Sequence, residues 1–126
     1  MSAAVSIRRA YEDPGPDDGY RVLVDRVWPR GVSRASLAID EWEREVAPST
    51  ALRRWYGHKV ERWEEFRDRY REELSAGSPA ESLARLVDHA TKGPLTLVFG
   101  ARDSDHSQAA VLRDLIRERL SGTNAR

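Results

Sequence analysis

Charged and aromatic side chains follow directly on a short apolar run near the start of the chain. Asp25 and Arg26 come straight after the run 22–24, and Trp28 and Arg30 lie within the next few residues. Such a run is typical of a buried strand, and ligands of open α/β sheets bind just beyond the carboxyl ends of the strands. Because isolated charges are costly inside a protein, these side chains need partners or a ligand. The segment predicts a polar site at a sheet edge and leaves the reaction open.

A second polar loop follows another apolar run, 95–99. Arg102, Asp103 and His106 separate this run from a segment with apolar residues at helical spacing. If the two strands are parallel neighbours, their loops meet at the same edge of the sheet. A helix that begins within 103–106 would point its free amides at this edge and favour an anion. Asp103 or Ser104 could instead simply cap that helix.

The two loops allow two interpretations of their charges. Arg30 and Arg102 can hold a phosphate or carboxylate by bidentate hydrogen bonds. Alternatively, they form a structural ion-pair network with Asp25 and Asp103. In either case we expect Asp25 to share a hydrogen-bonded cluster with Arg30 or Arg102, because a carboxylate at the end of a buried strand needs donors.

Histidine and tryptophan supply the remaining candidates. His58 follows Trp55, and a histidine in such a turn is more often a cap or a solvent-facing group than a catalyst. His58, His106 and Asp25 together could hold the metal of a hydrolase, but no ligand spacing supports this, so we assign no metal and no cofactor. Trp28 and Trp55 could wall a pocket, although each is more often part of a core.

Composition excludes several classes of function. The 126 residues include 21 basic and 21 acidic side chains, and this balance argues against a nucleic-acid partner. There is no cysteine, which excludes disulfides and thiol chemistry. We find no apolar run of signal-peptide or membrane-spanning length, so we expect a cytoplasmic protein with no membrane partner.

The pattern of elements predicts an α/β fold. We expect a small three- or four-stranded mixed, mainly parallel sheet, covered by about five helices in a single domain, 1–126, with a flexible tail from about 121 to 126. The first strand is too close to the second for a helical crossover, so these two are expected to pair antiparallel. The expected strands lie near 5–7, 21–27 and 95–99, and the expected helices are 40–46, 49–55, 60–74, one capped by Ser78 and one capped by Asp103 or Ser104.

Several of these segments together resemble a known family. The most specific is Arg21-Val-Leu-Val-Asp-Arg-Val-Trp-Pro-Arg-Gly31, followed by Ala47-Pro48-Ser49, by 52–58 and by 96–103. They resemble the YeaO-like branch of domain-of-unknown-function family 488 over nearly the whole chain. The resemblance implies no established activity, although members have been labelled transcriptional regulators. Other branches carry a cysteine in the second loop, and its absence here excludes their thiol chemistry.

We therefore expect a protein that binds an anionic small molecule at the strand ends, either as a binding protein or as an enzyme. Asp25 or His106 would serve in proton transfer. The expected ligand-binding residues are Arg26, Trp28, Arg30, Trp55, His58, Arg102 and Asp103. The alternatives are a regulatory or interaction module, including one acting on nucleic acid, and a metal-dependent hydrolase. The oligomeric state stays open.

Overall fold

Four parallel strands form the centre of the computed structural model, which describes residues 5–124. They are β1 (Val5–Arg9), β2 (Tyr20–Leu23), β3 (Glu41–Trp42) and β4 (Leu95–Phe99). Their order in the sheet is β1-β4-β2-β3. The central strand β4 pairs with both β1 and β2, and all five of its residues are buried. Such complete burial is typical of a parallel strand that is covered on both faces.

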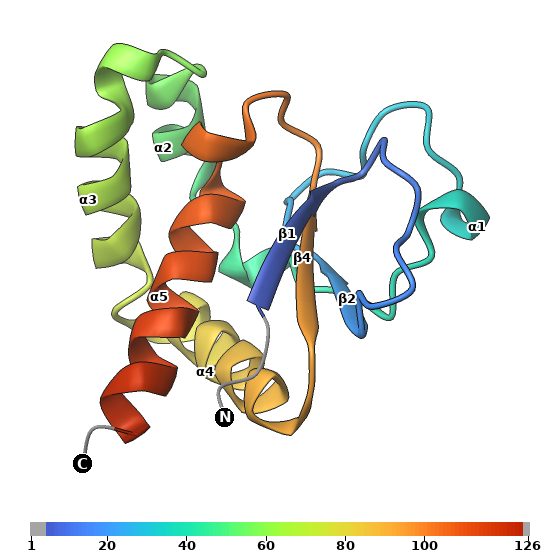
Figure 1. The fold of residues 1–126 in the computed structure, drawn as a ribbon. Helices are drawn as coiled ribbons and strands as arrows, with labels where there is room; N and C mark the ends of the chain where they lie inside the picture. Colours follow the sequence, from blue (N-terminus) through green and yellow to red (C-terminus); the bar gives the residue numbers. More distant parts are fainter. Residues whose placement is uncertain (1–4, 125–126) are drawn as a thin grey trace.

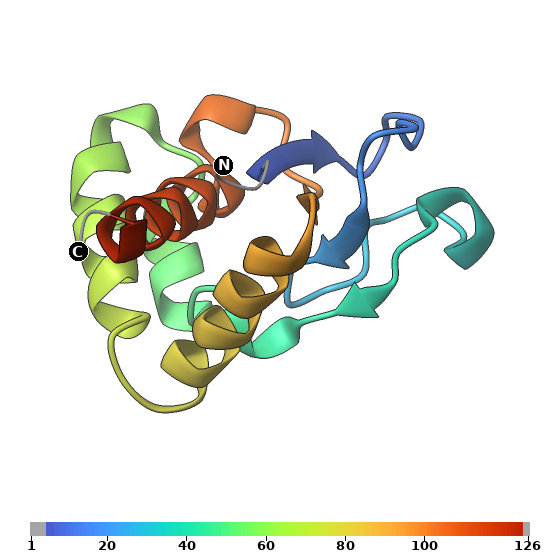
Figure 2. The ribbon, with the colours of Figure 1, turned by 60° about the horizontal axis from the view of Figure 1, so that its bottom comes forward.

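Helices cover the two faces of the sheet unequally. Four of them, α2 to α5, gather on one side, whereas the single turn of α1 lies on the other (Figures 1 and 2). The helices are α1 (Arg34–Leu37), α2 (Thr50–Tyr56), α3 (Trp63–Glu73), α4 (Gly77–Lys92) and α5 (Gln108–Asn124), with short 3-10 turns η1 (Arg44–Val46), η2 (Val60–Arg62) and η3 (Ser104–His106).

Alternation along the strands divides the apolar side chains between two cores. Val22 and Val24 join the large core beneath the four longer helices, while Leu23 between them joins a small core that contains Leu37 of α1. In β4, Leu97 and Val98 divide in the same way. Successive residues of a strand face opposite sides, so both cores follow from the apolar runs.

The expected fold class is confirmed, but one predicted pairing is wrong. The sheet has four strands, and all of its pairs are parallel. The first two strands do not pair antiparallel, because β4 lies between them and pairs with each. The chain between β1 and β2 is too short for a helical crossover, as expected. The two strands nevertheless do not pair with each other, because β4 is inserted between them.

The predicted helix over 40–46 is also wrong. This segment forms β3 and then η1, and Trp42 lies in register with Leu23 of β2. Ile39 and Trp42 pack against the small core, whereas Val46 belongs to the large one. The three side chains are spaced as on one helix face, yet they serve opposite faces of the sheet.

The ends of the helices follow the sequence in part. Ser49 caps α2 by accepting a hydrogen bond from the amide of Leu52, and Gly57 ends it in the left-handed conformation, close to the expected bounds 49–55. By contrast, α4 begins at Gly77 without a side-chain cap, so Ser78 is not its cap.

The last helix begins and ends later than its sequence predicted. The hydroxyl of Ser107, rather than Asp103 or Ser104, accepts from the amide of Ala110 at the start of α5 (3.2 Å). The helix continues through Asn124, into the expected tail; residues 125 and 126 lie outside the described part. Among the described residues, no helix combines the length and the apolar character needed to cross a bilayer.

Candidate functional site

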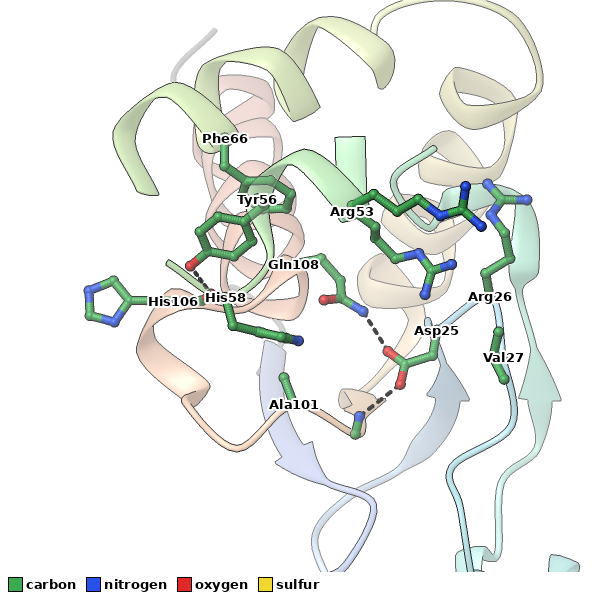
Figure 3. Close-up of a pocket in the computed structure, with 12 residues that line it drawn as sticks. Asp25, Arg26, Val27, Arg53, Tyr56, His58, Phe66, Ala101, His106 and Gln108 are labelled. Carbon is green, nitrogen blue, oxygen red and sulfur yellow. Dashed lines mark hydrogen bonds between the residues drawn. The ribbon is translucent and has the colours of Figure 1, made fainter. Parts of the chain in front are cut away.

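A pocket of about 490 Å³ lies where the carboxyl ends of β2 and β4 meet the last turn of α2 and the start of α5. Figure 3 shows the carboxyl group of Asp25 at its base, with Arg26 and Arg53 on one side and His58 on the other. The residues that line it are Asp25, Arg26, Val27, Arg53, Arg54, Tyr56, His58, Phe66, Gly100, Ala101, His106 and Gln108.

Two fixed donors hold the Asp25 carboxyl group. The amide of Gly100 donates to Oδ2 (2.8 Å), and Nε2 of Gln108 donates to Oδ1 (2.5 Å). Burial raises the pKa of Asp25 to about 6, although the Gly100 amide, the positive charge of Arg53 and the Gln108 amide all act to lower it. The carboxyl group therefore changes its charge close to neutral pH.

Glycine at position 100 permits this close approach. A Cβ atom there would lie 3.1 Å from Oδ2 of Asp25, tighter than ordinary van der Waals contact. The end of β4 thus supplies both a donor and the space for the carboxylate.

Three arginines bring positive charge to the same pocket. Arg53 and Arg54 occupy the last turn of α2, and Arg26 follows Asp25 in the chain. Nη2 of Arg26 donates to the carbonyl of Ala47 (3.1 Å), while its buried Nε has no hydrogen-bond partner among the described residues. Within residues 5–124, none of the three arginines forms an ion pair with a carboxylate. Their charge is left for the pocket and for solvent.

Two histidines lie on the other side of the pocket. His58 is exposed and has a φ of 57°, in the left-handed region that few residues other than glycine adopt. Nδ1 of His106 lies 2.7 Å from a carboxylate oxygen of Asp103, and its carbonyl accepts from the hydroxyl of Tyr56 (2.8 Å). Tyr56 stacks on Phe66 beneath them, with ring centroids 4.3 Å apart. This side is aromatic and polar, in contrast to the arginine side.

Nearly the whole chain matches a family model. Residues 4–126 match a family model described as "Inactive DUF488-N3 subclade". The chain belongs to the DUF488 family. Its similarity extends to "Uncharacterized protein YeaO" of Escherichia coli, which is 41% identical over 113 residues, 90% of this chain and 96% of that one. "Uncharacterized protein Rv3073c" of Mycobacterium tuberculosis is 43% identical over 115 residues, 91% of this chain and 95% of that one. No solved structure shows a significant match.

The pocket of this DUF488 protein gathers four of the residues predicted from sequence, namely Asp25, Arg26, His58 and His106. Asp103 is adjacent, through its contact with His106. The expected cluster of Asp25 with Arg30 or Arg102 is wrong, because Gly100 and Gln108 supply the hydrogen bonds to this carboxylate.

The other expected ligand residues lie elsewhere. Arg30 and Arg102 are exposed and do not line the pocket. Trp28 packs edge-on against Trp42, with ring centroids 5.4 Å apart, and donates to the carbonyl of Val32. The placement of Trp28 follows from the small core on the α1 side, against which it packs.

Trp55 lies over a shallow depression on the α2 and α3 side, where Arg62 and Arg69 stack on its ring. It is thus separated from its helical neighbours Arg53 and Arg54, which reach the pocket. Consecutive positions of a helix point in different directions, which explains the division.

Sequence reasoning missed Arg53, Arg54 and Gln108. The basic pair had one available signal, its place just before the glycine that ends a short helix. That signal has an ordinary explanation, because cations stabilise the carboxyl end of a helix. Gln108 carried no signal, because its place depends on where α5 begins.

The structure also bears on the alternative of a metal site. Among residues 5–124, no group of three or more His, Asp or Glu side chains lies close enough together to hold a metal ion. The set Asp25, His58 and His106 therefore shares a pocket without forming such a group.

Proposed function

We propose that this protein binds a small anionic molecule in the pocket at the ends of β2 and β4. The observation that carries the proposal is the charge of the lining: it contains three arginines, Arg26, Arg53 and Arg54, and the single carboxylate of Asp25, with which none of them forms an ion pair. The excess positive charge at a concave site favours an anion.

Arginine suits this role by its geometry. Each guanidinium presents a planar fork of donors that matches a carboxylate or phosphate, and hydrogen bonds between charged groups are among the strongest in proteins. The buried Nε of Arg26 also has no partner within the described chain. Leaving a buried donor without a hydrogen bond costs free energy, so an oxyanion that reached this Nε would be stabilised.

Binding without turnover is the form of the proposal that we favour. Asp25, with a pKa of about 6, is the feature that would suit proton transfer. The Gly100 amide and Gln108, however, both donate to its carboxylate and favour the ionised form, which can accept a hydrogen bond from a bound molecule without taking up the proton. The description of the matched subclade as inactive also argues against turnover. Asp25 and His106 then become contacts to the ligand rather than catalysts.

The test is a thermal-shift titration with phosphate against chloride at matched ionic strength. Stabilisation should follow mass action and reach about 2.7 kcal/mol at a hundredfold excess of phosphate over the dissociation constant. Replacing both Arg53 and Arg54 by Gln should weaken binding by about tenfold or more, since each charged hydrogen bond contributes about 1.5–3 kcal/mol.

Arg119→Gln is the matched control, because Arg119 is an exposed arginine of α5 outside the pocket. It should leave the titration unchanged. Equal stabilisation of all variants, or no phosphate-specific shift in the unaltered protein, would contradict the proposal.

A further inference from the structure

The carboxylate of Asp25 lines the pocket and can accept further hydrogen bonds there. Each carboxylate oxygen can accept two hydrogen bonds, and each oxygen of Asp25 receives one from a fixed donor, the Gly100 amide or the Gln108 side chain. Figure 3 shows the two hydrogen bonds of this carboxyl group among the residues that line the pocket. These two bonds orient the carboxyl group.

A fixed carboxylate in an anion pocket distinguishes between anions. A fully deprotonated oxyanion would place an oxygen against the oxygens of Asp25, with repulsion and no hydrogen bond. An oxyanion that still carries a proton can donate it to Asp25 while its other oxygens accept from the arginines. The amide oxygen of Gln108 and an unprotonated ring nitrogen of His58 or His106 can also accept such a proton, so the Asp25→Asn variant is needed to separate their contribution from that of Asp25.

We propose that this pocket selects an oxyanion that retains a proton, hydrogen phosphate or the monoanion of a phosphomonoester, over one without a proton such as sulfate, and that Asp25 makes the selection. The inference rests on the proposed anion-binding function and names the class of ligand. It assigns Asp25 a role in specificity that charge attraction by the arginines cannot supply.

The decisive comparison is isothermal titration of the unaltered protein with phosphate and with sulfate at about pH 8, where Asp25, with a pKa of about 6, is ionised. The two anions have similar size and shape, and both are largely divalent at this pH. We expect phosphate to bind at least about tenfold more tightly, a difference of about 1.4 kcal/mol.

Variants locate the source of the preference. Asp25→Asn offers an amide that both donates and accepts, so sulfate should gain affinity and the preference should fall to about threefold or less. Asp13→Asn, at an exposed site in the β1–β2 loop, removes the same charge and should keep the full preference. A preference that survives in Asp25→Asn would overturn the inference.

A second measurement follows the preference as the pH changes. When the pH falls through about 6, Asp25 gains a proton and can donate to sulfate, so the ratio of the two affinities should shrink. The other titratable and charged groups of the lining are His58, His106, Tyr56 and the three arginines. Phosphate itself takes up a second proton near neutral pH, so the fall in the ratio is compared with the fall in Asp25→Asn, and only the excess in the unaltered protein reports on Asp25.

Titration with glycerol phosphate distinguishes a phosphomonoester from free phosphate as the ligand. A phosphomonoester loses its second proton near pH 6, whereas inorganic phosphate keeps one at about pH 8. Glycerol phosphate should therefore bind weakly at about pH 8 and gain affinity at about pH 6. If it then binds more tightly than phosphate, the ester is the better ligand; if more weakly, free phosphate is.

The outcomes separate the two proposals. Equal binding of phosphate and sulfate by the unaltered protein would overturn the selection by Asp25 and leave anion binding in place. Binding of neither anion would overturn both.

Discussion

Replacing Asp25 by asparagine should change how the stability of the protein depends on pH. Burial raises the pKa of Asp25 from 3.8 to about 6, so the folded protein holds a proton there that the unfolded chain has already lost. A raised carboxyl pKa contributes stability that is fully present below the unfolded pKa and is lost as the pH rises through the folded pKa. The loss falls between about pH 4 and pH 6.

The size of this effect follows from the shift. One pKa unit corresponds to about 1.36 kcal/mol, so two units give up to about 3 kcal/mol. Asparagine has no such proton to lose. The free energy of unfolding of Asp25→Asn minus that of the unaltered protein should therefore rise by about 2–3 kcal/mol between about pH 4 and pH 8.

Urea denaturation at each pH, in chloride salts without oxyanions, measures this difference. Taking the difference between the two proteins cancels every other titrating group that the substitution leaves unperturbed. Asp13→Asn again serves as the control for the loss of one carboxylate. A difference that is independent of pH would refute the reasoning. A difference that falls with pH would mean that Arg53 and the two donors outweigh burial.

Three further substitutions test the fold. Asp18→Asn should lower the free energy of unfolding by about 3–5 kcal/mol in urea denaturation, because Asp18 pairs with two arginines, one of them buried; its pKa is lowered, so the same contribution should be lost as acid protonates it. Tyr70→Phe should cost about 1–3 kcal/mol by the same assay, because the buried hydroxyl donates to the carbonyl of Val46. Gly57→Ala should cost about 1–2 kcal/mol and lower the melting temperature, since φ is 51° there. Unchanged melting curves would contradict each expectation.

The sequence predicted the strands and their ends better than the order of the strands. Apolar runs identified β2 and β4, and the rule that ligands bind beyond strand ends correctly placed Asp25 and Arg26 at a pocket. Nothing in the local pattern shows that β4 inserts between β1 and β2, because this order depends on how the helices pack over one face. The predicted helix over 40–46 was wrong for a related reason, because the apolar residues of this segment belong to two cores.

The partners of Asp25 were the least predictable part of the site. Arg30 and Arg102 are close to strand ends in sequence, yet their side chains are exposed and line no part of the pocket. Arg53 arrives from α2 through tertiary packing, and Gln108 through the start of α5, which Ser107 sets. Spacing along the chain predicts neither contact.

An amide NMR titration of the labelled protein with phosphate, in a constant chloride background, tests the anion site most directly. We expect saturable shifts centred on the amides of Gly100, Ala101 and Gln108, which line the pocket, and on that of His58. The shifts should weaken when both Arg53 and Arg54 are replaced by Gln. Shifts confined to α1 or to the depression beside Trp55, or shifts that do not saturate, would contradict an anion site in this pocket.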